Sequence, residues 1–205
     1  MSKNREWEDF WEKHAPTDFM RLPWQLTHPA RKKVYEIAEG RGDSVLDVGC
    51  GTGIDYLGFI NRGMRYVGVD ITPKFISRFK ELHPEAEVYV NSSLELPFPD
   101  GAFPIVYSGG VIQHMHPEDY PKAIREMWRT CENTLILTTS KSFMKINIIQ
   151  KVRRGTVYDN HYSMPKFLEI VRSLPHFKDV RFHANFKQVT EGEPYTVVEI
   201  MKRKK

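Results

Sequence analysis

A nine-residue stretch, VLDVGCGTG at positions 45–53, constrains this chain more than any other part of its sequence. Its first half is mostly apolar and has strand propensity, and its second half alternates other residues with Gly49, Gly51 and Gly53. Glycine lets the backbone turn sharply and approach a ligand where a Cβ atom would collide. We expect a helix to start at about residue 54, with its first N–H groups facing a ligand. A strand, a glycine loop and a helix in this order predict a nucleotide-cofactor site.

The spacing of these glycines separates two kinds of cofactor. Dinucleotide-binding loops carry G-x-G-x-x-G, in which a helix N-terminus receives a pyrophosphate. Here the spacing is G-x-G-x-G, and the loop is flanked by Asp47 and Asp55. Carboxylates repel a diphosphate and attract a cation. The loop therefore favours a positively charged cofactor.

A further acid follows at a place that suits a nucleoside. Residues 66–70, YVGVD, predict the next strand, which ends at Asp70. A carboxylate there can accept hydrogen bonds from both hydroxyls of a ribose. Two alternatives stay open, because NAD-binding units also place an acid here and because Asp70 can cap the helix that starts at Thr72 and Pro73.

These motifs resemble the class I S-adenosylmethionine-dependent methyltransferases, whose first motif is an acidic strand end followed by G-x-G-x-G. The resemblance implies that the cofactor is S-adenosylmethionine, a sulfonium with an α-amino group, and that S-adenosylhomocysteine is the product. It also implies a set of residues that hold the cofactor. These are Asp47, Gly49, Cys50, Gly51, Gly53, Asp70, Ile71, Ser92, Ser93, Leu94 and Ser108.

Residues 91–115 resemble the loop that this family places over the adenine, followed by its fourth strand. The chain departs from the family pattern at Ser92, where an acid would contact the adenine amino group, and at Pro104, where a second acid precedes the strand. A serine hydroxyl still accepts a hydrogen bond, and the backbone N–H of Ser93 or Leu94 can reach a ring nitrogen. Pro104 suits the first residue of a strand, where its missing N–H costs little.

The order of predicted elements is that of an α/β protein. Helices are predicted at 5–14, 29–40, 54–62, 73–82, 118–130 and 164–174, and strands at 44–48, 65–69, 87–90, 105–108, 134–139, 179–186 and 196–203. Their alternation predicts a parallel sheet, and the last two strands should pair antiparallel because no helix separates them. The resemblance implies a three-layer sandwich around a seven-stranded, mostly parallel sheet that ends in an antiparallel hairpin. We expect a helical cap or lid over residues 1–40 and one cofactor-binding unit over 41–205.

Catalysis should take place at the carboxyl ends of the strands, where parallel sheets bind ligands. The protein has to hold a nucleophile in line with the methyl group and remove its proton. His114 is the leading candidate base, because imidazole titrates near neutrality and IQHM resembles the position of a catalytic histidine in phosphoethanolamine methyltransferases. Many related enzymes carry a structural histidine at this place, so that alternative stays open.

The segment 153–167 forms a second candidate wall, between the fifth predicted strand and the next helix. It gathers Tyr158, His161 and Tyr162, which can bind an acceptor or act as bases. The alternative is a helix entry with Ser163 as N-cap and the tyrosines packed on the sheet.

Composition and charge bound the remaining interpretations. The chain has 205 residues, of which 40% are hydrophobic, enough for one substantial core. Part of the net charge of +4 lies at 202–205, a run typical of a solvated tail, while a cluster at Lys151, Arg153 and Arg154 is placed to attract an anion. We expect no metal, since no third ligand accompanies the H-x-H of residues 114–116 at suitable spacing. The N-terminus lacks a secretory signal and no apolar run is long enough to span a membrane, so we expect a cytoplasmic location.

Three functional hypotheses follow. The first is methyl transfer to an oxygen or nitrogen atom of a small molecule. The second is methyl transfer to RNA or protein, and the third is a non-catalytic module with the same fold. A small-molecule acceptor is the expected partner, and we expect neither a membrane nor nucleic acid. The sequence identifies neither the acceptor nor the oligomeric state.

Overall fold

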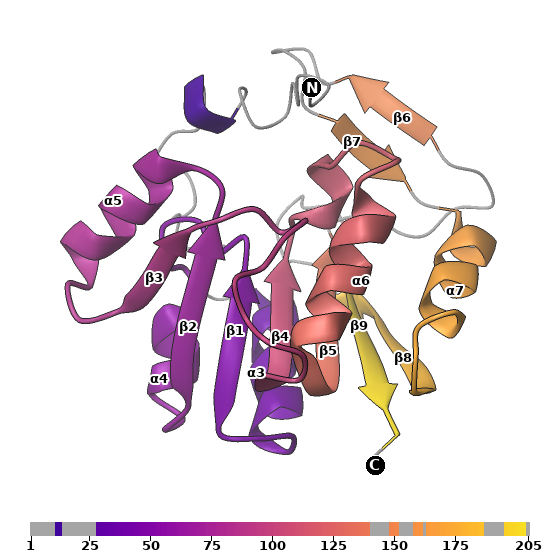
Figure 1. Ribbon diagram of the computed structural model, residues 1–205, viewed down its shortest axis with the longest axis horizontal. Helices are drawn as coiled ribbons and strands as arrows, with labels where there is room; N and C mark the ends of the chain where they lie inside the picture. The colour runs from indigo at the N-terminus through magenta and orange to yellow at the C-terminus, as the bar shows by residue number, and fades with distance from the viewer. Residues whose placement is uncertain are drawn as a thin grey trace.

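The computed structural model describes residues 11–13, 28–139, 148–151, 158–161, 163–186 and 195–203; of these, 148–151, 158–161, 184–186 and 195 are described by their backbone. A seven-stranded sheet with the order β3-β2-β1-β4-β5-β9-β8 forms the middle of three layers (Figure 1). The first five strands in this order are parallel, and β9 runs antiparallel to both of its neighbours. The predicted fold class is confirmed, including its closing antiparallel hairpin.

The strands of this sheet are β1 (Ser44–Val48), β2 (Arg65–Asp70), β3 (Glu87–Val90), β4 (Phe103–Gly109), β5 (Cys131–Thr139), β8 (Phe177–Phe186) and β9 (Tyr195–Lys202). The helices are α3 (Pro29–Glu39), α4 (Tyr56–Ile60), α5 (Pro73–Leu82), α6 (Tyr120–Thr130) and α7 (Met164–Arg172), with a 3-10 turn, η2 (Ile112–His114), after β4. Residues 11–13 are helical, and the rest of the predicted helix 5–14 lies outside the described residues. Within the described part of the chain, no helix has the length and apolar content needed to cross a bilayer.

Several element boundaries differ from the prediction by one to three residues, and two of the differences have clear local reasons. The helix predicted at 54–62 is shorter, because residues 51–55 form turns and α4 begins only at Tyr56. Strand β4 begins at Phe103, two residues earlier than predicted. Pro104 is its second residue and lies at a shift in register between Phe103 and Ile105, so the missing proline N–H interrupts no regular ladder there.

A second, two-stranded sheet was not predicted. In it β6 (Ile148–Lys151) pairs antiparallel with β7 (Tyr158–His161), and β7 lies against η2. Both strands lie beyond the carboxyl ends of the parallel strands (Figure 1). Residues 153–162, RRGTVYDNHY, lack the apolar alternation that predicts a strand, so backbone pairing here left no signal in the sequence.

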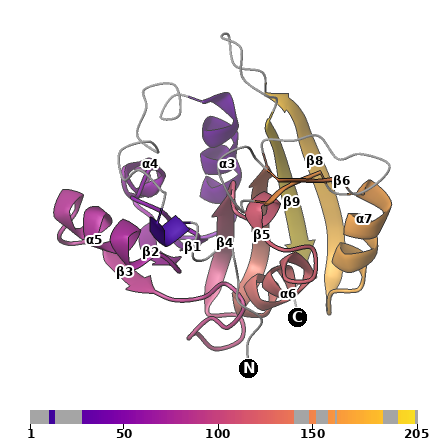
Figure 2. The same ribbon diagram turned by 90° about the horizontal axis from the view of Figure 1, so that it is seen from above.

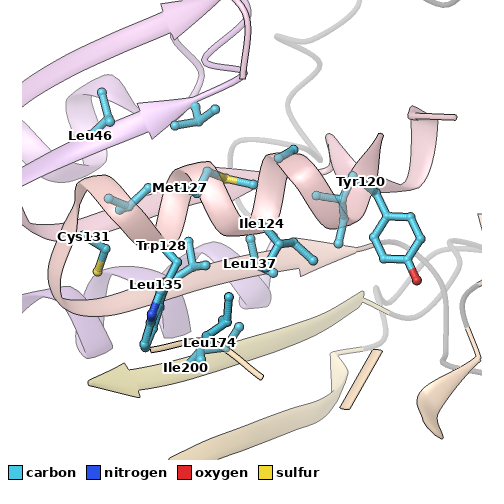
Figure 3. Packing of buried hydrophobic residues seen from close by; sticks show 14 of the residues in the cluster. Leu46, Tyr120, Ile124, Met127, Trp128, Cys131, Leu135, Leu137, Leu174 and Ile200 are labelled. Carbon is cyan, nitrogen blue, oxygen red and sulfur yellow. The ribbon is translucent and has the colours of Figure 1, made fainter. Parts of the chain in front are cut away.

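Apolar layers cover both faces of the large sheet. Buried residues of α3, α4 and α5 pack on one face, and those of α6 and α7 pack on the other (Figure 2). Figure 3 shows how Trp128 of α6 lies over Leu135 of β5 and close to Ile200 of β9. Helix α3, which falls within the cap or lid expected over residues 1–40, is built into one of these layers. The cap or lid itself stays a prediction.

Lys202, at the end of β9, holds the turn by which the chain passes directly from α6 into β5. Its Nζ donates to the carbonyl oxygen of Trp128 at 2.6 Å and to that of Cys131, and it lies 4.7 Å from the centre of the Trp128 ring. Carbonyls at the end of a helix lack partners within the helix and form the negative end of its dipole. The ammonium group therefore satisfies the end of α6.

We expect the substitution Lys202→Met to lower the free energy of unfolding by about 1–3 kcal/mol, since it removes charged hydrogen bonds to partly buried carbonyls. Urea unfolding followed by circular dichroism measures this change. Arg203→Met is the matched control, because Arg203 is exposed and its side chain should contribute less than about 0.5 kcal/mol. Equal losses in the two variants would contradict this role of Lys202.

Candidate functional site

The glycine loop lies at the carboxyl ends of β1 and β2 and is bound to β2 by three backbone N–H groups. Those of Gly49 and Cys50 donate to the Val69 carbonyl oxygen at 2.7 and 3.0 Å. That of Gly51 donates to Asp70 Oδ2 at 2.9 Å. Parallel sheets bind their ligands at this edge, so these bonds set the shape of the candidate site.

The first and last glycines of the loop cannot be replaced without strain. Gly49 and Gly53 have φ values of 80° and 84°, in the left-handed region. A Cβ atom on Gly49 would lie 2.2 Å from Val111, and one on Gly53 would lie 2.6 Å from the Phe79 ring. The loop is therefore packed closely against both the segment after β4 and helix α5.

Asp70 ends β2 with its carboxylate held by two backbone donors. Gly51 N–H donates to one oxygen and Thr72 N–H to the other, both at 2.9 Å. Burial raises the pKa of Asp70, and these two bonds oppose the rise. The Thr72 side chain and the Ile71 backbone N–H also hydrogen-bond this carboxylate and oppose the rise in its pKa. Thr72 is the N-cap residue of α5 and its side chain makes no capping bond, while Asp70 accepts the Thr72 N–H, so the alternative that Asp70 serves the start of this helix stays open.

Asp55 is held in a buried network on the α3 side of the sheet. It accepts hydrogen bonds from the hydroxyls of Tyr35 at 2.7 Å and Tyr107 at 3.2 Å, and it forms an ion pair with Arg31. Burial disfavours the charged guanidinium, but the Asp55 carboxylate raises the pKa of Arg31 above its ordinary value. The charge of Asp55 is thus compensated by Arg31 within the protein. This corrects the expectation that the charge of Asp55 attracts a cationic cofactor.

Asp47 is buried in β1, just before the glycine loop. Its Oδ2 accepts a hydrogen bond from the Tyr66 hydroxyl at 2.7 Å. Burial and the nearby charge of Asp55 raise the pKa of Asp47 well above its usual range. Its role toward the cofactor stays a prediction, and its observed contact is with Tyr66.

The predicted adenine-contacting residues form a turn after β3. Ser92 Oγ accepts a hydrogen bond from Leu94 N–H at 3.3 Å, so this N–H serves the turn itself. Ser93 is buried, and its N–H makes no hydrogen bond within the described part of the chain. Of the two backbone donors that we expected to reach the adenine ring, Ser93 is therefore the better placed.

The other predicted cofactor residues differ in what their side chains do. Cys50 points below the loop toward Gly68, and burial raises the pKa of its thiol well above the ordinary value. Ser108 donates its hydroxyl to the Val48 carbonyl oxygen at 2.8 Å, which joins β4 to β1. Ile71 is partly exposed beside Asp70. Contact of these residues with a cofactor stays a prediction.

His114 lies in η2, directly after β4, and is partly buried. Its Nε2 is 3.4 Å from the side-chain nitrogen of Gln113. Trp11 meets the His114 ring edge-on at a centroid distance of 5.4 Å and lies 6.2 Å from the Phe75 ring at the start of α5. Lys74 Nζ also donates to the Glu12 carbonyl oxygen at 2.6 Å. The described N-terminal turn therefore lies across the edge of the sheet from α5 to η2.

The second candidate wall is described only in part. Tyr158 and His161 are the end residues of β7, whose backbone lies against η2 and therefore near His114. Their side chains, all of Tyr162 and the side chains of the basic cluster at 151–154 lie outside the described residues. Their catalytic or binding roles stay predictions.

Comparison with known proteins agrees with this geometry. A family model described as a methyltransferase domain matches residues 45–134, from β1 to β5, which contain the glycine loop, Asp70 and η2. The chain is 33% identical over 140 residues to the tRNA U34 carboxymethyltransferase of Hahella chejuensis, covering 63% of this chain and 42% of that protein. It is 30% identical over 88 residues to the malonyl-[acyl-carrier protein] O-methyltransferase of Serratia marcescens, covering 43% and 34%. The resemblance to the class I S-adenosylmethionine-dependent methyltransferases is thus confirmed over residues 45–134.

Solved structures of methyltransferases share its fold. Magnesium protoporphyrin IX methyltransferase from Synechocystis PCC 6803, with bound S-adenosylmethionine, matches with a TM-score of 0.71 at 16% identity and covers 96% of this chain and 95% of its own. The 1,6-didemethyltoxoflavin-N1-methyltransferase of Burkholderia thailandensis matches with a TM-score of 0.68 at 20% identity, covering 86% and 79%. The chain spans less than half the length of the two curated relatives named above.

The partners of Asp55 were not predicted from the sequence. Arg31 and Tyr35 are four residues apart on α3, a spacing that places both on one helix face. Tyr107 comes from β4, where it pairs in register with Asp47 of β1. Only the helical spacing was visible in the sequence, and it did not indicate the acid that these groups contact.

Removing Arg31 should leave the buried Asp55 carboxylate without its cation. We expect Arg31→Met to lower the free energy of unfolding by about 3–5 kcal/mol, and Asp55→Asn in the same chain to recover at least about 1 kcal/mol of this loss. Urea unfolding of both single variants and the double variant measures the coupling. Lys32→Met, on an exposed position of the same helix, is the control. Strictly additive losses would show that Arg31 and Asp55 do not depend on each other.

Proposed function

We propose that this protein binds S-adenosylmethionine at the carboxyl ends of β1 and β2 and transfers its methyl group to an oxygen or nitrogen atom of a small molecule. The observation that carries the proposal is the fixed carboxylate of Asp70 beside a loop of three glycines with positive φ. Backbone N–H groups orient this carboxylate, and a carboxylate fixed in this way suits hydrogen bonds from ribose hydroxyls.

Each end of the cofactor has protein groups to receive it. Asp70 would hold the ribose, the backbone N–H of Ser93 would meet the adenine, and the glycine loop would pass close to the methionine part. The sulfonium of the bound cofactor supplies an activated methyl group and a good leaving group. The chain itself then has to orient the acceptor, exclude water and take up the acceptor's proton.

We propose that His114 acts on the acceptor. It follows β4 at the same edge of the sheet as the glycine loop, and Val111 of the same segment touches the loop at Gly49. The contact of His114 Nε2 with Gln113 is long at 3.4 Å, so an acceptor hydroxyl or ammonium can replace it as a hydrogen-bond partner. In this proposal His114 removes the proton, and Tyr158, His161 and Tyr162 complete the wall.

Trp11 supports a small acceptor and a covering role for the residues before α3. Its ring contacts both His114 and Phe75, so it lies over the edge at which the acceptor must enter. Two structural neighbours are named for small molecules, a porphyrin and a didemethyltoxoflavin. We propose that this N-terminal turn belongs to a lid that shields the reacting groups from water.

RNA is the alternative acceptor, because the chain is 33% identical over 140 residues to a tRNA U34 carboxymethyltransferase. Incubation with radiolabelled cofactor and either total tRNA or a panel of small hydroxy and amino compounds separates the two. Label in tRNA, together with binding that weakens steeply with salt, would favour RNA over a small molecule.

Asp70 should control cofactor affinity. We expect Asp70→Asn to weaken binding of S-adenosylhomocysteine by about 10- to 100-fold, since it removes charged hydrogen bonds to the ribose. Burial raises the pKa of Asp70, and the proton removes acceptor capacity, so wild-type affinity should fall as pH falls through that pKa while the variant changes less. Isothermal titration calorimetry across pH measures both effects. Asp43→Asn, exposed at the other end of β1, should bind as the wild type does.

His114 should control the chemical step. We expect His114→Gln to lower kcat by about 100-fold or more, because a positioned base contributes about that much, and to leave the Kd of S-adenosylhomocysteine within about twofold. His116→Gln is the control, since His116 Nδ1 accepts the Glu118 N–H in the turn before α6. A variant at His114 with unchanged kcat would contradict its role as the base.

A further inference from the structure

Two side chains of α6 hold the loop between β3 and β4, residues 91–102, which we call the adenine loop. Arg129 Nη1 donates to the Phe98 carbonyl oxygen and to Asp100 Oδ1, both at 2.8 Å. Its Nη2 donates to the Leu96 carbonyl oxygen at 3.1 Å. One guanidinium therefore contacts three successive points of a loop that has no regular secondary structure.

Glu126 completes this arrangement from one helical turn earlier. Its Oε1 accepts the Leu96 N–H at 2.8 Å and Arg129 Nη2 at 2.7 Å, and its Oε2 accepts Arg129 Nε at 2.9 Å. The backbone N–H of Leu96 is thus bound by Glu126, and its carbonyl oxygen is bound by Arg129. We call Glu126 and Arg129 the α6 clamp. Its bidentate, charge-assisted geometry is specific to arginine, because a lysine presents only a point charge.

The clamp lies just beyond the turn that we expect to face the adenine. Leu96 is buried, and Glu95 N–H donates to the Ser92 carbonyl oxygen at 3.2 Å, so the turn at 92–95 and the clamped residue are adjacent. Gly101 N–H donates to the carbonyl oxygen of Arg129 at 2.8 Å, which holds the other end of the loop. A shift at Leu96 must therefore be transmitted directly to the turn.

Adenine recognition in this chain should depend on the position of the adenine loop more than it would in a chain with an acid at residue 92. A flexible acidic side chain can adjust to reach the adenine amino group, whereas Ser92 Oγ is bonded to Leu94 N–H within the turn. Recognition then depends on Ser92 Oγ, whose second lone pair can still accept a hydrogen bond, and on the backbone N–H of Ser93, which has no side-chain freedom. Its position is set by whatever holds the loop.

We propose that Glu126 and Arg129 are positioning residues for cofactor recognition. They hold the adenine loop in the position in which its backbone meets the adenine. The inference rests on the proposed binding of S-adenosylmethionine and extends it to two residues that do not touch the cofactor. The clamp controls affinity for the adenosine end of the cofactor and leaves the methyl-transfer step unchanged.

The test compares Arg129→Met with Arg125→Met. Arg125 lies on the same helix, is exposed and donates only to the Pro121 carbonyl oxygen at 3.3 Å, so it controls for the loss of a charge on α6. Calorimetry measures the Kd of S-adenosylhomocysteine and of 5′-methylthioadenosine, which keeps the adenosine and lacks the amino-acid end. We expect Arg129→Met to weaken both ligands by a similar factor of about 10, and Arg125→Met to stay within about twofold.

Two further readouts separate positioning from a purely structural role. The KM for S-adenosylmethionine should rise in Arg129→Met while kcat stays within about twofold, since binding alone is affected. The preference for S-adenosylhomocysteine over S-inosylhomocysteine, in which an oxo group replaces the adenine amino group, should shrink. Arg129→Lys should bind the cofactor with intermediate affinity, and it gives the same comparison if the methionine variant does not fold.

The outcomes that overturn the inference are distinct from those that overturn the proposed function. Unchanged Kd values in Arg129→Met, or weaker binding of S-adenosylhomocysteine without weaker binding of 5′-methylthioadenosine, overturn the role of the clamp alone. A lower thermal stability with unchanged Kd values and unchanged nucleoside preference does the same. A wild-type protein that binds no S-adenosylhomocysteine overturns the proposed function and this inference with it.

Discussion

The attachment of the glycine loop to the end of β2 is the interaction on which the rest of the site depends. Gly49 and Cys50 share the Val69 carbonyl oxygen, and Gly51 donates to Asp70. These bonds place the last residue of β2 beside the loop that follows β1. Because Gly49 and Gly53 lack side chains, the segment after β4 and helix α5 can then pack directly on the loop. The candidate base and the candidate ribose acceptor are thus positioned by one short piece of backbone.

Three aspartates around this loop illustrate how environment separates residues of the same type. Asp55 is neutralised by Arg31, and Asp47 is buried with the Tyr66 hydroxyl. Asp70 is held by backbone N–H groups, which orient its carboxylate. The electrostatic argument from sequence treated Asp47 and Asp55 as free charges near a cofactor. In the folded protein the carboxylate of Asp55 is bound by buried protein groups, and Asp70 remains the acid best suited to a ligand.

Most of the architecture could be predicted, because β1, β2 and β4 are apolar strands that are each followed by a helix, and this order leaves few topologies. The helix Pro73–Leu82 and the strand Glu87–Val90 have their predicted bounds. The pairing of β6 with β7 was not predicted, since the segment 153–162, which contains β7, lacks the apolar alternation of a strand. The α6 clamp was also invisible, because its acceptors are carbonyl oxygens, which every residue possesses.

The sequence by itself determined the class of fold, the position of the glycine loop and the acid that ends β2, because glycine spacing and strand periodicity are local properties of the chain. Only the tertiary structure decided which acids are neutralised, which backbone donor of the adenine loop stays available and which side chains of α6 hold that loop. Hydrogen bonds and ion pairs join residues far apart in the chain, such as Arg129 with Phe98 or Arg31 with Asp55. Their partners are set by how helices pack on the sheet, which no local pattern encodes.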